Sequence, residues 1–252
     1  MEFINLASSS SGNAYYISLE RKDLPPVKLM LEVGLPYDEL QRKAVQNGIN
    51  LADMDAFLIT HGHNDHCRAM KPLLERNRPV WANSALVTAN KGNPARVLTH
   101  NEYRFIAAET KVLPFSVEHD AEDPLGFIIS TDVETILFVN DCKFFTADIS
   151  KIPFDYIFIE ANYDGQVIHF AYEEAKKEND VSNIKRYERL INSHLSIRHT
   201  IDILKKLNLS QCKAVFLMHL SDRHANENLF KSRCTEEIGI RTFVCKKHGG
   251  IL

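Results

Sequence analysis

The polar segment that follows the apolar run Ala56–Thr60 constrains this chain more than any other feature. It reads His-Gly-His-Asn-Asp-His and holds four side chains of metal-ligand type within six residues. If the apolar run is a strand, alternate side chains of its extension share one side, so His61, His63 and Asp65 converge. His66 then turns inward where a helix begins. A polar surface loop that happens to hold three histidines is the alternative, and the spacing behind an apolar strand disfavours it.

Imidazole together with carboxylate suits a borderline divalent cation such as Zn²⁺ or Mn²⁺. One cation cannot easily take four ligands from so short a segment, whereas two adjacent cations can if each gains ligands from elsewhere. Three more ligand-type residues stand just after apolar, strand-like runs, where a core position makes least sense. The predicted ligands are His61, His63 and His119 for one cation, Asp65, His66 and His219 for the other, and Asp141 as a bridge between both.

Such a pair of cations predicts hydrolytic chemistry. Two cations roughly 3.5–4 Å apart stabilise a developing oxyanion and activate a water nucleophile. Metal coordination lowers the pKa of water to about 7, so the nucleophile exists at neutral pH. We expect Asp65 to act in catalysis as well, by orienting that water or by accepting its proton.

The composition is that of an ordinary globular protein. Of the 252 residues, 44% are hydrophobic and 25% are charged, which excludes disorder and simple repeat architectures. Lys and Arg number 30 against 33 Asp and Glu, so the formal net charge of -3 provides no long-range attraction to DNA or RNA. No linker divides the chain, and we predict a single domain over residues 1–252.

Apolar or β-branched runs and amphipathic runs alternate along the chain. Strands are predicted over Ala14–Leu19, Thr135–Val139 and Lys213–Met218, among others, and helices over Pro36–Asn47 and Phe170–Leu207. Strands first, followed by strands that alternate with helices, predict an α/β protein with layered sheets and helices outside.

The cysteines and the N-terminus indicate a cytoplasmic protein, in its own cell or in a host cell. The five cysteines are scattered, odd in number and without a Cys-x-x-Cys pair, which argues for a reducing compartment. The first residues lack a basic start followed by an apolar core, so no signal peptide is predicted. No apolar run approaches the roughly 20 residues that cross a bilayer, and we expect no membrane partner.

These residues resemble the metallo-β-lactamase superfamily, and the match runs in order from the first strands to His219. Further segments are similar to the WalJ/YycJ branch of phosphodiester-cleaving enzymes, which is itself similar to ribonuclease Z. They are Ala7–Asn13, His119–Ala121 with Pro124–Phe127, Glu160–Asn162 and His194–Ser196. The resemblance implies a metallo-β-lactamase-like αββα four-layer sandwich of the α/β class. It also implies a dimetal site at one edge of the two sheets, with the seven ligands named above.

The same branch implies a general acid. Its His-Leu-Ser segment places a histidine near the scissile phosphate, and here that residue is His194. The alkoxide that leaves during phosphodiester cleavage is a poor leaving group unless it is protonated. A neighbour of a helix cap is the alternative role for His194. The chain departs from the family pattern at Glu32, where Asp is usual, and it shows no long exosite arm like that of tRNA-processing members.

Four residues are candidates for substrate contacts. Ser10 and Asn13 belong to the turn Ser8–Asn13, which offers backbone N–H groups to a phosphate. Arg223 follows the last predicted ligand and can pair with a phosphate oxygen. Ser196 can assist the general acid. The alternatives are a tight turn packed below the metal loop, a solvated arginine, and a helix cap at Ser196.

We therefore predict a dinuclear phosphodiesterase that hydrolyses nucleotide phosphodiester bonds with two Zn²⁺ or Mn²⁺ ions. A cyclic nucleotide is the favoured substrate, because the net charge is acidic and no basic arm is visible. The neighbourhood of the branch includes phage anti-Pycsar enzymes that degrade cyclic nucleotide defence signals. A WalJ/YycJ-like 5′–3′ exonuclease on DNA or RNA is the alternative. A thioester or lactone hydrolase and a non-catalytic nucleotide binder stay open. The resemblance implies a homodimer, and the helical stretch over residues 170–207 is a candidate for its contact.

Overall fold

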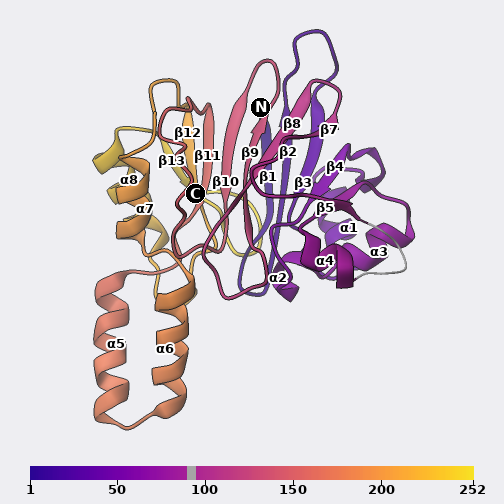
Figure 1. The fold of residues 1–252 in the computed structure, drawn as a ribbon. Coiled ribbons are helices and arrows are strands. Elements are labelled where there is room, and N and C mark those ends of the chain that lie inside the picture. Colours follow the sequence, from indigo (N-terminus) through magenta and orange to yellow (C-terminus); the bar gives the residue numbers. More distant parts are fainter. Residues whose placement is uncertain (90–94) are drawn as a thin grey trace.

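A computed structural model of the chain describes residues 1–89 and 95–252. Two β-sheets lie face to face, and helices cover the outer face of each sheet (Figure 1). The order of layers is helix, sheet, sheet, helix, so the predicted αββα four-layer sandwich is confirmed.

Within the described residues the first sheet has six strands, which lie side by side in sequence order. They are β1 (Glu2–Ser9), β2 (Gly12–Leu19), β3 (Val27–Leu31), β4 (Ala56–Leu58), β5 (Val80–Ala82) and β6 (Arg96–Val97). Strands β1 to β3 pair antiparallel, and β3 to β6 pair parallel.

The second sheet has seven strands in the spatial order β13-β12-β11-β10-β9-β8-β7 among the described residues. They are β7 (Arg104–Ala107), β8 (Thr110–Ser116), β9 (Leu125–Ser130), β10 (Thr135–Val139), β11 (Tyr156–Glu160), β12 (Ala214–Met218) and β13 (Thr242–Val244). Strands β7 to β10 pair antiparallel, and β10 to β13 pair parallel.

Helices from different parts of the chain cover the two sheets. On the first sheet lie α1 (Tyr37–Gln46), the 3₁₀ turn η1 (Leu51–Asp53), α2 (Asn64–Cys67), α3 (Met70–Glu75) and α4 (Ser84–Ala89). On the second lie α7 (Ile197–Leu204) and α8 (Glu227–Ile238). Across residues 1–89 and 95–252, none of the helices combines the length and apolar character that crossing a membrane requires.

Alternation of side chains explains why the inner strands are buried on both faces. In β2, Tyr15, Ile17 and Leu19 point between the sheets, whereas Ala14 and Tyr16 pack below the helices of the first layer. A strand buried on both faces reads as a continuous apolar run, which is the pattern by which β2 was predictable.

The helices α5 (Gly165–Lys177) and α6 (Val181–Ser193) project from the sandwich as a hairpin (Figure 1). The sequence pattern predicts one helical stretch over Phe170–Leu207, but the structure divides this region into α5, α6 and α7. Asp180 ends the turn between the first two helices, because its side chain accepts a hydrogen bond from Asn183 N at 3.0 Å and caps α6. The region predicted as one helical stretch therefore contains a projecting helical hairpin.

Candidate metal centre

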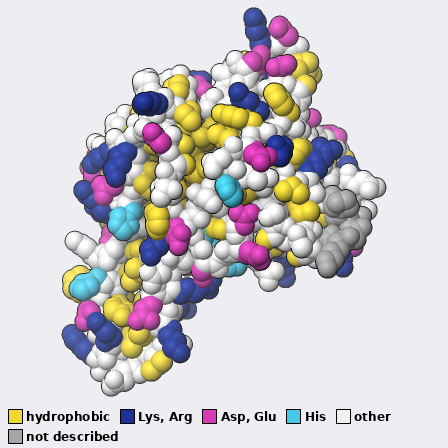
Figure 2. All heavy atoms as spheres, viewed as in Figure 1, with side chains coloured by type: hydrophobic (Ala, Val, Ile, Leu, Met, Phe, Trp, Pro, Cys, Tyr) yellow, Lys and Arg dark blue, Asp and Glu magenta, His cyan; other side chains and the backbone are white. Residues whose placement is uncertain are grey.

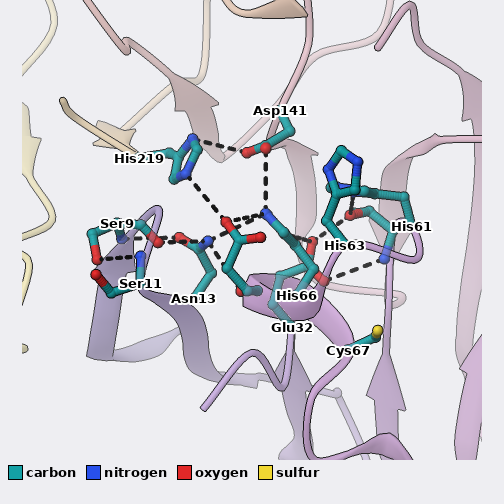
Figure 3. A network of polar contacts seen from close by, with 12 residues as sticks. Ser9, Ser11, Asn13, Glu32, His61, His63, His66, Cys67, Asp141 and His219 are labelled. Atoms are coloured by element: carbon teal, nitrogen blue, oxygen red, sulfur yellow. Dashed lines mark hydrogen bonds and ion pairs between the residues drawn. The ribbon is translucent and has the colours of Figure 1, made fainter. Parts of the chain in front are cut away.

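The histidine-rich loop joins β4 to α2 at the edge of the first sheet, and Glu32 supports it. Glu32 directly follows β3 and has a φ of 60°, and its backbone N–H donates to Leu58 O at 2.9 Å. Its carboxylate accepts a hydrogen bond from Thr60 Oγ1 at 2.5 Å and lies 3.2 Å from His66 Nδ1 (Figure 3). The carboxylate at this position therefore reaches the loop, although the resemblance implied the shorter Asp.

Gly34 and Asn13 fix the same loop from the other side. A Cβ at Gly34 would lie 1.6 Å from Asp65 O, so only glycine allows this close approach. Asn13 Nδ2 donates to Asp65 O at 3.2 Å and to Ser9 O at 3.0 Å. Asn13 is fully buried, so it positions the metal loop, and its predicted role as a substrate contact receives no support from this geometry.

The first predicted half-shell is assembled from three elements. His61 Nε2 lies 3.1 Å from His63 Nδ1, and His119 Nε2 lies 3.2 Å from that same Nδ1 atom. His119 follows β8, and its Nε2 is 3.5 Å from Asp141 Oδ2. Ligands around a tetrahedral Zn²⁺ at 2.0–2.1 Å stand about 3.3 Å apart, so these nitrogens have the spacing of a coordination shell.

The second half-shell shares Asp141 with the first. His66 Nε2 lies 3.3 Å from Asp65 Oδ2 and 3.3 Å from Asp141 Oδ2. His219 follows β12, and its Nε2 is 3.7 Å from Asp65 Oδ2. Figure 3 shows His66, Asp141 and His219 turned toward one another. All seven predicted ligands thus meet in one place, with Asp141 between the two groups.

Two further observations support the binding of divalent cations by these residues. His219 Nε2 is buried and has no hydrogen-bond partner among the described residues. A buried polar atom without a partner costs about 1–3 kcal/mol, unless another ligand satisfies it. The pKa of His61 lies well below the ordinary value, first because the ring is buried, and neutral imidazole is the form that binds a metal.

Glu160, at the end of β11, is the functional residue that the sequence analysis did not select. Its Oε1 lies 2.6 Å from His194 Nδ1 and 3.0 Å from His219 Nδ1, and its Oε2 accepts hydrogen bonds from Leu195 N and Cys142 N, each at 3.0 Å. The missed signal was a carboxylate at the last position of a buried strand, close to the signal that selected the ligands.

The Glu160 carboxylate controls the charge of His194. Burial alone lowers the pKa of His194, but the attraction of Glu160 outweighs it, so the pKa lies above the ordinary value. The His194 ring is 5.1 Å from the ring of His119 and 5.3 Å from that of His219, measured between centroids. The His194 ring thus lies beside one ligand from each half-shell, and Glu160 favours its protonated form.

The other predicted substrate residues lie in different places. Ser10, at the tip of the β1–β2 hairpin, lines a cavity of about 220 Å³ together with His194 and His219. Ser196 is buried and caps α7 by accepting a hydrogen bond from His199 N at 3.2 Å, as the alternative interpretation has it. Arg223 is exposed on the segment that follows the last ligand.

Comparisons with known proteins agree with this architecture. The sequence profile of the Beta-lactamase superfamily domain matches residues 36–220. The chain is 23% identical to "Exodeoxyribonuclease YycJ" of Bacillus anthracis, over 88% of this chain and 83% of that protein. It is 25% identical to "Exodeoxyribonuclease WalJ" of Streptococcus pneumoniae, over 86% of this chain and 80% of that protein.

Solved structures share the fold at low sequence identity. YhfI from Bacillus subtilis, a metallo-beta-lactamase fold protein, superposes with a TM-score of 0.71 at 11% identity, covering 99% of this chain and 97% of its own. A diphosphatase from the PhnP family gives a TM-score of 0.65 at 15% identity, covering 99% and 95%. The resemblance to the superfamily and to WalJ/YycJ is confirmed. The chain therefore belongs to the beta-lactamase superfamily and is a metal-dependent hydrolase.

Proposed function

We propose that this chain hydrolyses phosphodiester bonds of nucleotide substrates, with two divalent cations held by the seven predicted ligands. The observation that carries the proposal is the pair Glu160–His194 beside both ligand groups. His194 Nδ1 is engaged by Glu160, so Nε2 is the ring atom left to deliver a proton. An alkoxide leaving group requires such an acid, which contributes about 10²–10⁴-fold to a rate.

The protein residues around the cations have separate tasks in this proposal. When bound, the cations supply Lewis-acid polarisation of the phosphoryl oxygens and lower the pKa of water to about 7. Burial raises the pKa of Asp141, but the attraction of His219 and His66 lowers it by more, and the ionised carboxylate is the form that would bind the cations. Asp65 would orient the attacking water, and its side chain, which is 22% exposed, supports this role.

A nucleic-acid strand is the substrate we propose, with DNA first. The relatives that cover most of the chain carry the name exodeoxyribonuclease. The projecting α5–α6 hairpin also weakens one reason for favouring a cyclic nucleotide, because its residues Arg186 and Arg189 line a cavity beside the metal centre. The proposed activity is therefore stepwise cleavage from a strand end.

A 3′,5′-cyclic nucleotide is the second candidate. The net charge of -3 and the small cavity of about 220 Å³ next to His194 favour a compact substrate. In that case the chain would degrade nucleotide signals, as the resemblance to phage enzymes implied.

The experiment that tests the proposal compares these substrates on one preparation. Enzyme loaded with Mn²⁺ or Zn²⁺ is incubated with end-labelled DNA, with labelled RNA and with 3′,5′-cyclic nucleotides. We expect progressive shortening of DNA from one end while cyclic nucleotides stay intact. Turnover of cyclic nucleotides with intact strands would promote the second candidate, and no product from any phosphodiester would overturn the proposal.

The His194→Ala variant separates phosphodiester chemistry from the remaining alternatives. Thioesters and lactones have leaving groups that need less protonation, so their hydrolysis would survive loss of His194. A non-catalytic binder would retain nucleotide over many hours without product. We expect neither behaviour from the metal-loaded protein.

We also propose that the cations are Zn²⁺ or Mn²⁺, that the protein works in the cytoplasm and that it forms a homodimer. The chemistry of the donor set supports the first point. Exposed apolar side chains on the hairpin support the last, with Phe170 73% exposed and Val181 60% exposed. Elemental analysis and sedimentation of the purified protein test the cation and dimer proposals.

A further inference from the structure

A small cavity opens next to the metal centre on the side of the hairpin. It has a volume of about 220 Å³ and is bounded by His194 and His219 on one side and by helix α6 on the other. Two residues of α6, Arg186 and Arg189, provide its only lysine or arginine side chains among the described residues. The rest of the lining is Ser10, Asn162, Leu190, Ser193, Leu220 and Ser221.

The cavity on the His63 side of the centre has a different lining, and it adjoins the first cavity through the ion pair of Asp120 with Arg189. A second cavity, of about 370 Å³, adjoins His63 and is lined by Asp120 and Glu122 together with small apolar residues of α4. None of the described residues that line it is a lysine or an arginine. The positive charge beside the metal centre is therefore concentrated on the α6 side.

Arg186 and Arg189 differ in how firmly they are held. Arg186 donates to Tyr187 Oη at 3.2 Å and stacks over that ring, and the described residues give it no ion pair with a carboxylate. Arg189 Nε lies 2.5 Å from Asp120 Oδ2 in an exposed pair, which contributes little to stability. Both guanidinium groups can therefore turn to a phosphate without a large cost.

The predicted substrate contact Arg223 is exposed and does not line this cavity, so the two arginines of α6 carry its positive charge. Guanidinium groups bind phosphate by paired, charge-assisted hydrogen bonds.

We propose that Arg186 and Arg189 bind a second phosphate of the substrate, next to the phosphate that is cleaved at the metal ligands. This inference rests on the proposed function. A cyclic mononucleotide has a single phosphate, which the metal centre would occupy, so the two arginines would have no partner. The geometry points to a substrate with at least two phosphates, as in a strand end that carries a terminal phosphate.

The test uses binding, so that it does not depend on turnover. The probes are dithymidines joined by an uncleavable methylphosphonate, with a 5′-phosphate, with a 3′-phosphate or with neither, titrated into metal-loaded enzyme by calorimetry. We expect one terminal phosphate to raise the affinity about tenfold to hundredfold, the usual range for hydrogen bonds to a charged group. Arg186→Gln and Arg189→Gln should each remove most of that gain.

Lys185→Gln is the matched control, because Lys185 is exposed on the same helix and does not line the cavity. Equal affinity of the three probes for the wild type, or an undiminished preference in both arginine variants, would overturn the inference. A phosphate preference that depends on the arginines, in a protein that cleaves no phosphodiester, would sustain the pocket and refute the proposed function.

Discussion

The metal centre and the α5–α6 hairpin are built in opposite ways. The centre lies at the ends of strands from both sheets, and its ligands are held by buried partners such as Glu32 and Glu160. The hairpin has only a small apolar cluster of its own, with four buried residues: Tyr163, Ile168, Ala175 and Tyr187. Figure 2 shows the hairpin surface as a mixture of basic, acidic and apolar side chains.

This difference separates chemistry from recognition. The rigid sandwich fixes the distances between the ligands, which catalysis requires to within a fraction of an ångström. The hairpin contributes arginines to one cavity at the centre, and the end of α6 also supports the centre, because Ser193 O lies 2.7 Å from Nδ1 of the predicted ligand His119. Away from that end, the hairpin can change in charge without touching a ligand. Changes in the centre should therefore abolish turnover, whereas changes in the hairpin should alter substrate affinity.

Loss of the shared carboxylate should have the largest effect. Asp141→Ala removes a predicted ligand of both cations, and we expect the activity to fall about a thousandfold or more, because metal-ion catalysis is worth several kcal/mol. Elemental analysis should show less than two cations per chain. Asp148→Ala, an exposed site nearby, is the control and should keep both cations. Full metal content in the Asp141 variant would contradict the bridging role.

The positioning residue Glu160 should have the next largest effect. Glu160→Gln leaves the shape intact but weakens the charge that favours protonated His194, so cleavage of DNA should slow by about 10²–10⁴-fold. Bis(p-nitrophenyl) phosphate should lose much less, because p-nitrophenolate leaves without a proton. Equal losses on both substrates would mean that Glu160 acts only on the ligand His219 and not through the acid.

The parts of the fold that could be predicted are those that the apolar core dictates. Strands such as Ala14–Leu19 and Thr135–Val139 read as continuous apolar runs because both faces are buried, and the structure has strands there. The break between α5 and α6 was not visible, since Asn179 makes the turn with a φ of 53° and no Gly or Pro marks it. Edge strands such as β7 (Arg104–Ala107), with four residues, are also too short to stand out in a sequence pattern.

Some residues of the candidate site were also predictable from the sequence, and others were not. Ligand-type residues directly after strands were predictable, because strand ends meet at one edge of the sandwich. The hydrogen-bond partners of these residues were not predictable. Pairs such as Glu160 with His194 are 34 residues apart in the sequence, and their contact depends on the path of the chain between them. Arg186 and Arg189 also read as solvated helix residues, and only the position of the hairpin brings them to the cavity.

Hydrogen exchange should show the contrast in stability directly. Local opening requires little free energy where few apolar contacts are lost. We expect backbone amides of α5 and α6 to exchange at least about tenfold faster than those of β10 and β11, which lie inside the second sheet. Uniform protection across both regions would mean that the hairpin unfolds only together with the sandwich and is no less stable than the metal centre.

The smallest effect on the stability of the folded chain is expected from an exposed residue of the hairpin. Phe170 on α5 is 73% exposed, so Phe170→Ser should change the free energy of unfolding of one chain by no more than about 0.5 kcal/mol. If the hairpin forms the proposed homodimer contact, the same change removes an aromatic anchor, and the dissociation constant should rise about tenfold or more. Sedimentation velocity over a range of concentrations measures this, with Lys177→Ser on the same helix as the control. An unchanged dimer would mean that the dimer contact lies elsewhere than on the hairpin. A monomeric variant with full activity on bis(p-nitrophenyl) phosphate would show that the metal centre functions without the hairpin contact.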